Sequence, residues 1–200
     1  MSAEESSPRE KWETRYAASD YQPDTDPQPF LVEKCGHTHP GRALCLAAGG
    51  GRNAVYLAER GWEVTAVDIS TRGLAWCREL AACQKVRLNT LQADLLDFDM
   101  SEERYDLITS FYYYQPELFP RVKDALRPGG QFILETFSID QIRCDGGPRN
   151  PAHLVAPNAL LRSFADFRIR HYEDVVGERS VRGECQPAAL VRLLAEKERS

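Results

Sequence analysis

The stretch Leu44–Asp68, LCLAAGGGRNAVYLAERGWEVTAVD, holds an apolar run, a turn dense in glycine, a helical pattern and a second apolar run. The runs Arg42–Ala47 and Trp62–Asp68 have the length and composition of buried strands. Between them, Asn53–Gly61 repeats apolar residues at helical spacing and ends in glycine, which favours a helix that stops there. Two strands joined through a helix lie parallel in one sheet, so the stretch predicts an α/β fold.

The same alternation continues toward the end of the chain. Further strands are predicted at residues 86–94, 105–111 and 131–137, and further helices at 71–84, 116–130 and 156–166. The last two apolar segments, residues 167–178 and 188–197, have no helix between them, so they must pair antiparallel as an edge hairpin. We therefore predict a doubly wound, mainly parallel, seven-stranded sheet with an antiparallel C-terminal hairpin.

Composition and charge narrow the class of protein. The 200 residues are 42% hydrophobic and 28% charged, as in ordinary globular proteins, and the formal net charge of -5 argues against a nucleic-acid partner. No apolar run approaches the ~20 residues of a membrane span, and the N-terminus lacks the apolar core of a secretion signal. We expect a cytoplasmic monomer or homodimer without membrane contact.

The cysteines do not point to a disulfide framework or a metal site. All 6 have irregular spacing and none forms a CxxC pair, which predicts reduced thiols. Cys35, His37 and His39 are close in the sequence, but a metal would need a fourth ligand from elsewhere. We interpret this segment as a polar loop before the first strand and expect no metal.

The first 30 residues differ from the rest of the chain. Residues 1–10 are polar and are predicted to be disordered, whereas residues 11–21 carry three aromatic side chains and are predicted as a short helix. Residues 22–29, QPDTDPQP, read as a proline-punctuated loop, and residues 29–35 as the start of a helix. We expect residues 1–30 to be an N-terminal tail with a short aromatic helix, and residues 31–200 to be one domain.

The glycine-rich turn has the chemistry of a nucleotide site. In doubly wound sheets, ligands bind beyond the carboxyl ends of the strands where strand order reverses. Gly49, Gly50 and Gly51 permit close approach of the backbone to a ligand, and the next helix directs its free N–H groups at the same place. Asp68 ends the neighbouring strand, where a carboxylate can accept both ribose hydroxyls. The spacing also fits a dinucleotide-binding loop, so a nicotinamide cofactor stays an alternative.

The order of motifs along the whole chain separates these two cofactors. QAD (92–94) ends the third strand, LRPGG (126–130) precedes the fifth, and the reversed hairpin closes the sheet. Over residues 40–197 this order resembles the class I S-adenosylmethionine-dependent methyltransferases, which have a Rossmann-like fold. KWETRY, AGGGRNAVYLAERGWEVTAVDIS, YDLI and GGPRNP are more narrowly similar to the tellurite-resistance-type and thiopurine-methyltransferase-like groups.

This resemblance implies S-adenosyl-L-methionine as the cofactor and a set of residues around it. Beyond the three glycines and Asp68, the implied cofactor contacts are Trp12, Tyr16, Arg52, Asn53, Ile69, Asp94, Leu95, Ser110 and Phe111. Asp94 would accept from the adenine amino group, and Trp12 and Tyr16 would cover the cofactor. The chain departs from the class at Cys45 and Ala47, which replace the usual acid and first glycine. We expect Cys45 to be a buried packing residue.

The residues that would contact the methyl acceptor are predicted from two further segments of the sequence. Phe111–Tyr114 are aromatic and lie at the end of the fourth strand, where alternation would place Phe111 and Tyr113 on one side and Tyr112 and Tyr114 on the other for as long as the strand lasts. Tyr112, Tyr113, Arg149 and His153 are the predicted substrate residues, and no catalytic residue is assigned. We predict methyl transfer to a small molecule: a chalcogen oxyanion, a thiol or a similar soft nucleophile. The alternatives are an NAD(P)-dependent oxidoreductase and a cofactor-binding protein without catalysis.

Overall fold

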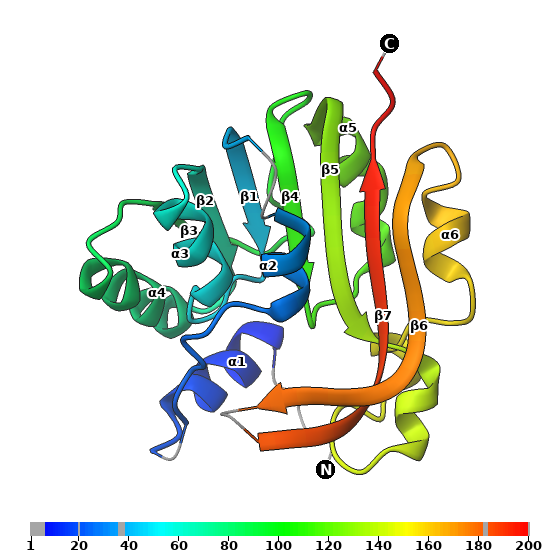
Figure 1. Cartoon of the computed structure of the whole chain (residues 1–200). Helices are drawn as coiled ribbons and strands as arrows, with labels where there is room; N and C mark the ends of the chain where they lie inside the picture. Colours follow the sequence, from blue (N-terminus) through cyan, green and yellow to red (C-terminus); the bar gives the residue numbers. More distant parts are fainter. Residues whose placement is uncertain (1–6, 20, 36–38, 182–183, 200) are drawn as a thin grey trace.

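The computed structural model describes residues 7–19, 21–35, 39–181 and 184–199. Seven strands form one sheet in the order β3-β2-β1-β4-β5-β7-β6 (Figure 1). The strands are β1 (Arg42–Leu46), β2 (Glu63–Asp68), β3 (Asn89–Gln92), β4 (Tyr105–Phe111), β5 (Leu126–Phe137), β6 (Arg168–Val181) and β7 (Glu184–Glu196). The first five are parallel, and β7 pairs antiparallel with both β5 and β6. The predicted doubly wound sheet with its reversed C-terminal hairpin is confirmed.

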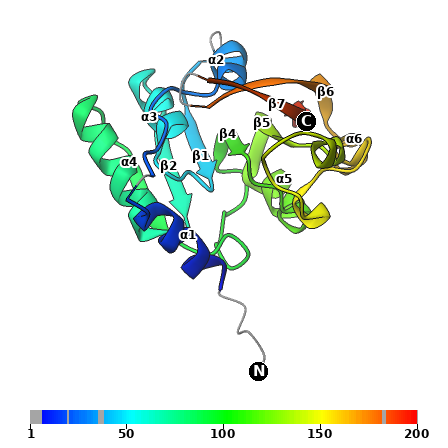
Figure 2. The same ribbon diagram turned by 90° about the horizontal axis from the view of Figure 1, so that it is seen from below.

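Helices cover both faces of the sheet. They are α1 (Pro8–Ala17), α2 (Pro29–Cys35), α3 (Arg52–Glu59), α4 (Thr71–Cys83), α5 (Phe119–Ala125) and α6 (Ala159–Ser163). Apolar residues of α2, α3 and α4 bury one face in what we call the α3-side core, and α5 and α6 bury the other in the α5-side core (Figure 2). Because β1 runs down the middle, its side chains enter both cores alternately, which explains its continuous apolar sequence.

Strand order reverses between β1 and β4, so the carboxyl ends of these two strands open onto a crevice. The register places Leu46 beside Ser110 of β4 and Val67 of β2, so the glycine loop, the end of β2 and the end of β4 meet at one edge. Helix α1 lies beyond this edge and packs against α4 (Figures 1 and 2). The fold therefore brings the N-terminal segment to the edge at which doubly wound sheets bind their ligands.

Several element boundaries differ from the prediction for local reasons. Residues 8–10 are helical rather than disordered, because Ser7 and Glu10 form a capping box and Pro8 suits the first turn. LRPGG is extended and belongs to β5, with Gly129 at φ 81°, rather than closing a helix. The third strand and α6 are shorter than expected. Residues 1–6 and His37 lie outside the described residues.

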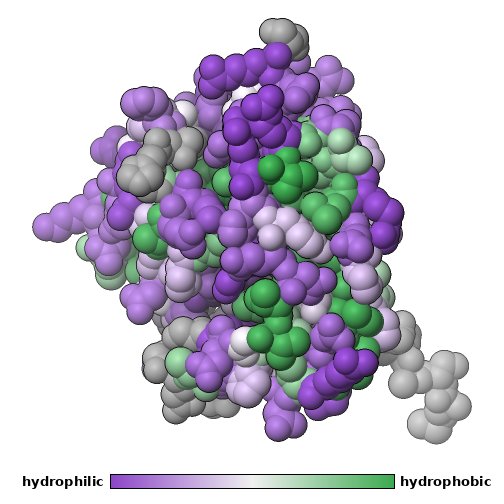
Figure 3. Space-filling view, turned by 45° about the vertical axis from the view of Figure 1, so that its right-hand side comes forward, coloured by the Kyte–Doolittle hydropathy of each residue, from purple (hydrophilic) through white to green (hydrophobic). Residues whose placement is uncertain are grey.

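The hairpin edge of the sheet is open to solvent. Val175 and Val176 of β6 are exposed, and on the face of the molecule that Figure 3 shows, apolar patches are separated by hydrophilic residues. Within the described ranges, none of the helices combines the length and apolar character that crossing a membrane requires.

Candidate functional site

The glycine loop is a tight turn that only small residues can make. Gly49 and Gly51 have φ values of 53° and 84°, and Gly51 is the N-cap of α3. A Cβ on Gly50 would stand 2.6 Å from Pro23, and one on Gly51 would collide with the sulfur of Cys77. The glycines are therefore required by the conformation and by close packing from both sides.

Asp68 is held against this loop by backbone amides. Its carboxylate accepts from the N–H of Gly49 at 2.7 Å and from the N–H of Ser70 at 2.8 Å, with 6% of the residue exposed. Burial raises the pKa of Asp68, and the two amide hydrogen bonds oppose that shift. Each oxygen keeps a further lone pair, so the carboxylate can still accept from a ligand.

The N-terminal helix reaches the same place. The hydroxyl of Tyr16 is packed against Gly49, and its ring contacts Gly73 at the start of α4. Trp12 stacks on Tyr16 at 5.7 Å between ring centroids, and the carboxylate of Glu13 accepts from the backbone N–H of Thr71 at 2.6 Å. Burial, followed by the charge of Asp68, raises the pKa of Tyr16. The predicted grouping of this aromatic segment with the glycine loop is thus present in the structure.

The loop that follows α1 is also attached to the glycine turn. Asp24 forms an ion pair with Arg52 at 3.1 Å, and the N–H of Gln28 donates to the side-chain oxygen of Asn53 at 2.8 Å. The side chains of Arg52 and Asn53, which the resemblance implied as cofactor contacts, therefore hold the N-terminal segment. Sequence reasoning missed this partnership because nothing in the spacing relates residue 28 to residue 53.

The aromatic run at the end of β4 stops alternating at Tyr112, because the strand has ended there. The strand ends at Phe111, and Tyr112 adopts a left-handed φ of 56°, which breaks the period of two. Phe111 packs with the α3-side core, whereas both Tyr113 and Tyr114 pack with the α5-side core. Burial and the charges of Asp94, Glu117 and Asp68 raise the pKa of Tyr113 to about 12. Tyr113 is therefore on the same side as the two carboxylates predicted to bind the cofactor.

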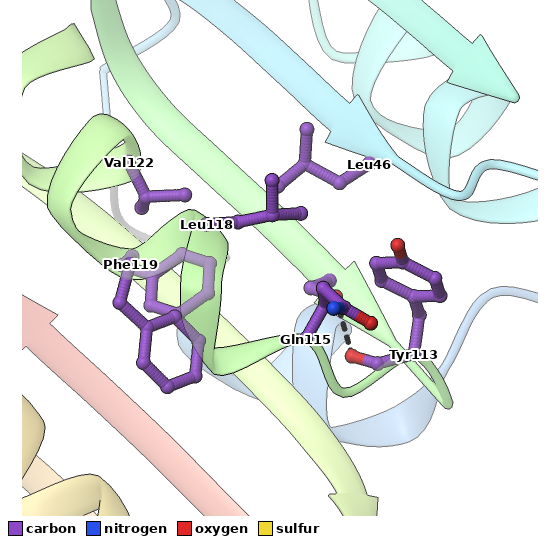
Figure 4. A pocket seen from close by; sticks show the side chains of 8 residues that line it. Leu46, Tyr113, Gln115, Leu118, Phe119 and Val122 are labelled. Atoms are coloured by element: carbon purple, nitrogen blue, oxygen red, sulfur yellow. Dashed lines mark hydrogen bonds between the residues drawn. The ribbon is translucent and has the colours of Figure 1, made fainter. Parts of the chain in front are cut away.

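A small apolar hollow lies at the end of β4. Figure 4 shows its lining, which is Leu46, Ser110, Tyr113, Gln115, Leu118, Phe119, Val122 and Phe132. The hydroxyl of Ser110 donates to the backbone oxygen of Tyr113 at 2.9 Å and fixes the turn. The volume inside it is about 10 Å³, roughly the space of a single water molecule.

A second buried carboxylate, Glu135, lies near the carboxyl end of β5. Only 2% of it is exposed, and it accepts from the guanidinium of Arg192 at 2.6 Å. Arg192 also pairs with Glu173 at 2.9 Å. The side-chain amide of Gln28, oriented to satisfy its neighbours, donates to Glu135 at 3.3 Å and accepts from Arg52. The sequence offered a signal for this pair that was not used: one charge within each of the apolar strands QFILETF and AALVRLLA.

The remaining predicted residues are spread more widely. Asp94 is exposed and accepts from the N–H of Leu96, Leu95 is buried, and Ile69 is half-buried beside Asp68. Arg149 and His153 are exposed on the segment after β5, where Arg149 donates to the carbonyl of Ile142 at 3.4 Å. Among the described contacts, none joins these last two to Asp68 or Glu135. In the same described ranges, no group of three His, Cys, Asp or Glu side chains is placed to hold a metal ion.

Cys45 is buried as predicted, with 2% exposed in the α3-side core. Burial raises the pKa of its thiol to about 12, so the side chain stays neutral. Ala47 has a φ of 48°, in the left-handed region that favours glycine. The altered first motif thus keeps the backbone path of a glycine loop.

Comparison with known proteins places this site in context. Residues 43–130 match a family described as a methyltransferase domain. The "Probable S-adenosyl-L-methionine-dependent methyltransferase TehB" of Haemophilus influenzae is 26% identical over 156 residues, which are 74% of this chain and 53% of that protein. The chain thus spans about half the length of the curated relatives it matches.

Two solved structures share the fold. TehB from Haemophilus influenzae gives a TM-score of 0.72 at 21% identity, over 95% of this chain and 67% of that one. A structure titled "Conversion of a Disulfide Bond into a Thioacetal Group during Echinomycin Biosynthesis" gives 0.75 at 20% identity, over 95% and 91%. The resemblance predicted from the sequence, to class I methyltransferases and to the tellurite-resistance type among them, is confirmed.

Proposed function

We propose that this chain, with its methyltransferase domain and class I fold, binds S-adenosyl-L-methionine and transfers its methyl group to a small soft nucleophile. The observation that carries the proposal is Asp68, a buried carboxylate fixed at the glycine loop by neutral amides only. A buried charge without a cationic partner is costly, and it suits a ligand that donates hydrogen bonds to it.

The residues around Asp68 fit an adenosyl group. Its ribose hydroxyls and adenine amino group are donors, and the site offers acceptors in Asp68, Asp94 and the hydroxyl of Tyr113. Ile69 and Leu95 would bound the adenine with apolar surface. The ligand's ammonium would be accepted by backbone carbonyls, with Ala47 and Ser110 as candidates, because Cys45 cannot take the part of an acid.

The cofactor, when bound, supplies a methyl group on a positively charged sulfur, and that S–C bond breaks as a lone pair of the acceptor forms the new bond. The work left to the protein is alignment and exclusion of water. Tyr16 and Trp12 would exclude water from above the glycine loop, and the aromatic turn after β4 would do so from the side of the acceptor.

Calorimetric titration tests the cofactor assignment. S-adenosylhomocysteine should bind and NADH should not, which would separate this proposal from a nicotinamide-dependent oxidoreductase. Asp68→Ala should weaken binding of S-adenosylhomocysteine by about tenfold or more, because hydrogen bonds to a charged group contribute about 1.5–3 kcal/mol each. The exposed Asp97→Ala is the matched control. Binding of NADH, or an unchanged affinity in Asp68→Ala, would contradict the assignment.

The N-terminal segment is proposed as a cover for the cofactor. Because Tyr16, Pro23 and Gln28 all contact the glycine loop or α3, a ligand there would be enclosed when the segment is in place. Deleting residues 1–20 should lower affinity and activity with little loss of thermal stability in the protein without ligand. Full activity in the truncated protein would show that the segment has no such role.

Methyl transfer itself is tested by product formation. Incubation with labelled S-adenosylmethionine and a panel of thiols, selenite and tellurite should yield a methylated product. Binding of S-adenosylhomocysteine with no product from any acceptor would favour the alternative, a cofactor-binding protein without catalysis.

A further inference from the structure

The chain between α1 and α2 is tied to the start of α3 and lies on the glycine loop. We call residues 22–28 the linking segment. The carboxylate of Asp24 pairs with the guanidinium of Arg52 at 3.1 Å, and Pro23 packs directly on Gly50. A ligand can therefore reach or leave the glycines from this side only when the linking segment lifts.

The side chain of Gln28 lies between a cation and an anion. Only 4% of Gln28 is exposed. With its amide oriented to satisfy its neighbours, the oxygen accepts from Arg52 at 3.3 Å and the NH₂ donates to the carboxylate of Glu135 at 3.3 Å. Figure 1 shows α2, which follows Gln28, in front of the sheet between α3 and β7. One amide at the end of the linking segment thus separates opposite charges that belong to α3 and β5.

Each of these charges has its own partner while the linking segment is in place. Glu135 accepts from Arg192 of β7 at 2.6 Å, and Arg192 also pairs with Glu173 at 2.9 Å. Among the described residues, Asp24 is the one carboxylate that pairs with Arg52. When the segment lifts, Arg52 therefore loses its anion at the same moment as the amide of the segment leaves the space beside Glu135.

We propose that Arg52 has two alternative anions and makes the linking segment a switch: it pairs with Asp24 when the segment covers the glycine loop, and with Glu135 once Gln28 has left the space between them. A guanidinium suits this exchange because it pairs strongly with either carboxylate. The largely buried cation stays paired in both states, which makes opening less costly than it would be if the charge were left alone. The opening itself involves no ligand, whereas its control of ligand exchange rests on the proposed function.

Hydrogen exchange in the protein without ligand measures this opening. The backbone N–H of Gln28 donates to Asn53 at 2.8 Å, so it exchanges when the segment lifts, and mass spectrometry of peptides that contain it gives the rate. Asp24→Asn removes the anion of the closed state and should speed exchange about fivefold. Asp26→Asn, which removes an exposed carboxylate from the same segment, is the matched control and should stay within about twofold.

A pair of variants separates a switch from a simple brace. Gln28→Met keeps a side chain of similar length but removes both contacts, so exchange should be about tenfold faster. Adding Glu135→Gln removes the anion of the open state, so the double variant should exchange at least about threefold more slowly than Gln28→Met alone. In a simple brace, the second substitution would leave exchange unchanged or speed it further. Arg192 keeps Glu173 as its partner in the double variant, and urea denaturation checks that the fold is retained.

The consequence for ligand exchange is measured by stopped-flow displacement of S-adenosylhomocysteine. Its dissociation should be faster in Gln28→Met than in the double variant, and faster in Asp24→Asn than in Asp26→Asn. Dissociation rates in another order would overturn the role of the switch in ligand exchange.

Two results of the exchange measurements would overturn the switch itself. One is equal exchange in Asp24→Asn and Asp26→Asn, and the other is a double variant that exchanges as fast as Gln28→Met or faster. A wild-type protein that does not bind S-adenosylhomocysteine would instead contradict the proposed function. Because hydrogen exchange is measured without ligand, the two failures are distinguishable.

Discussion

The two buried carboxylates at the crevice stand one strand away from the switch point, on opposite sides, and are held by different kinds of donor. Asp68 at the end of β2 is held by the amides of Gly49 and Ser70, whereas Glu135 of β5 is held by the guanidinium of Arg192. Amide dipoles orient a carboxylate without cancelling its charge, which leaves it able to bind a ligand. A guanidinium cancels the charge, which suits a residue that orients its neighbours.

The largest expected effect comes from removing the cation at the second carboxylate. Arg192→Met leaves Glu135 buried with neutral partners only, and breaking a buried pair in this way costs about 3–5 kcal/mol in the free energy of unfolding. Urea denaturation measures the loss. Arg170→Met, which breaks the more exposed pair with Glu196, is the control and should cost about 1 kcal/mol or less. Equal losses in the two variants would show that the Glu135 pair is not special.

Placing a third carboxylate between these two should cost somewhat less. Cys45 lies in β1 within the α3-side core, and its side chain interacts with the hydroxyl of Thr109, with neither an amide nor a guanidinium for a partner. Cys45→Asp should therefore lower the free energy of unfolding by at least about 2 kcal/mol at pH 7. Cys45→Ala, which removes only the thiol, should cost about 1 kcal/mol and leave affinity for S-adenosylhomocysteine within a few-fold.

The pH dependence of Cys45→Asp gives a second check. Burial without a charged partner raises the folded-state pKa of a carboxyl above its unfolded value, so the penalty is greatest at high pH. The stability gap to the wild type should narrow as pH is lowered from 7 to 5. An Asp variant that is more stable than the wild type and binds S-adenosylhomocysteine more tightly would show that the loop accepts an acid here after all.

For Asp68, the carboxylate held by amides, we expect substitution to change ligand affinity rather than stability. Asp68→Asn removes the charge and should weaken S-adenosylhomocysteine about tenfold at pH 7.5. Because burial raises the pKa of Asp68, lowering the pH protonates it earlier than an ordinary aspartate. Wild-type affinity should therefore decline on acidification from a higher pH than ordinary aspartate titration predicts, whereas the Asn variant should show no such decline. If affinity depends on pH in the same way in the wild type and in Asp68→Asn, then Asp68 does not contact the ligand.

The two carboxylates also differ in whether their role could be predicted from the sequence. Asp68 was predicted because a glycine loop, a helix and a strand end follow one another within Leu44–Asp68, where local spacing fixes their relation. Glu135 and Arg192 are 57 positions apart, and they meet only because β7 inserts between β5 and β6. Antiparallel return of the hairpin was predicted, but its insertion and register were not, so the pair could not be assembled.

The turn at Tyr112 escaped prediction for a related reason. Alternation of side chains holds only while the strand continues. The sequence FYYYQ contains no glycine that would indicate a left-handed residue at its end. Tertiary contacts with Glu135 and Phe137 maintain that conformation instead. For Arg149 and His153, the sequence suggested more than the described contacts show. Their positions after β5 predicted that they lie over the same face as the aromatic turn, but no described contact joins either residue to Asp68 or Glu135.

The smallest effect is expected at Ala47, which directly follows β1. This residue has a φ of 48°, and a left-handed residue other than glycine costs about 1–2 kcal/mol. Glycine would remove that strain, but it would also gain freedom in the unfolded chain, which offsets about 0.4–1 kcal/mol. Ala47→Gly should therefore raise the free energy of unfolding by about 0.5 kcal/mol, and affinity for S-adenosylhomocysteine should stay within about twofold because no ligand contact is lost. The methyl group of Ala47 packs against the α5-side core. A loss of stability in Ala47→Gly, measured by urea denaturation, would show that the packing of this methyl group outweighs the strain of the left-handed backbone. The loop beside Asp68 would then be adapted to alanine rather than to glycine.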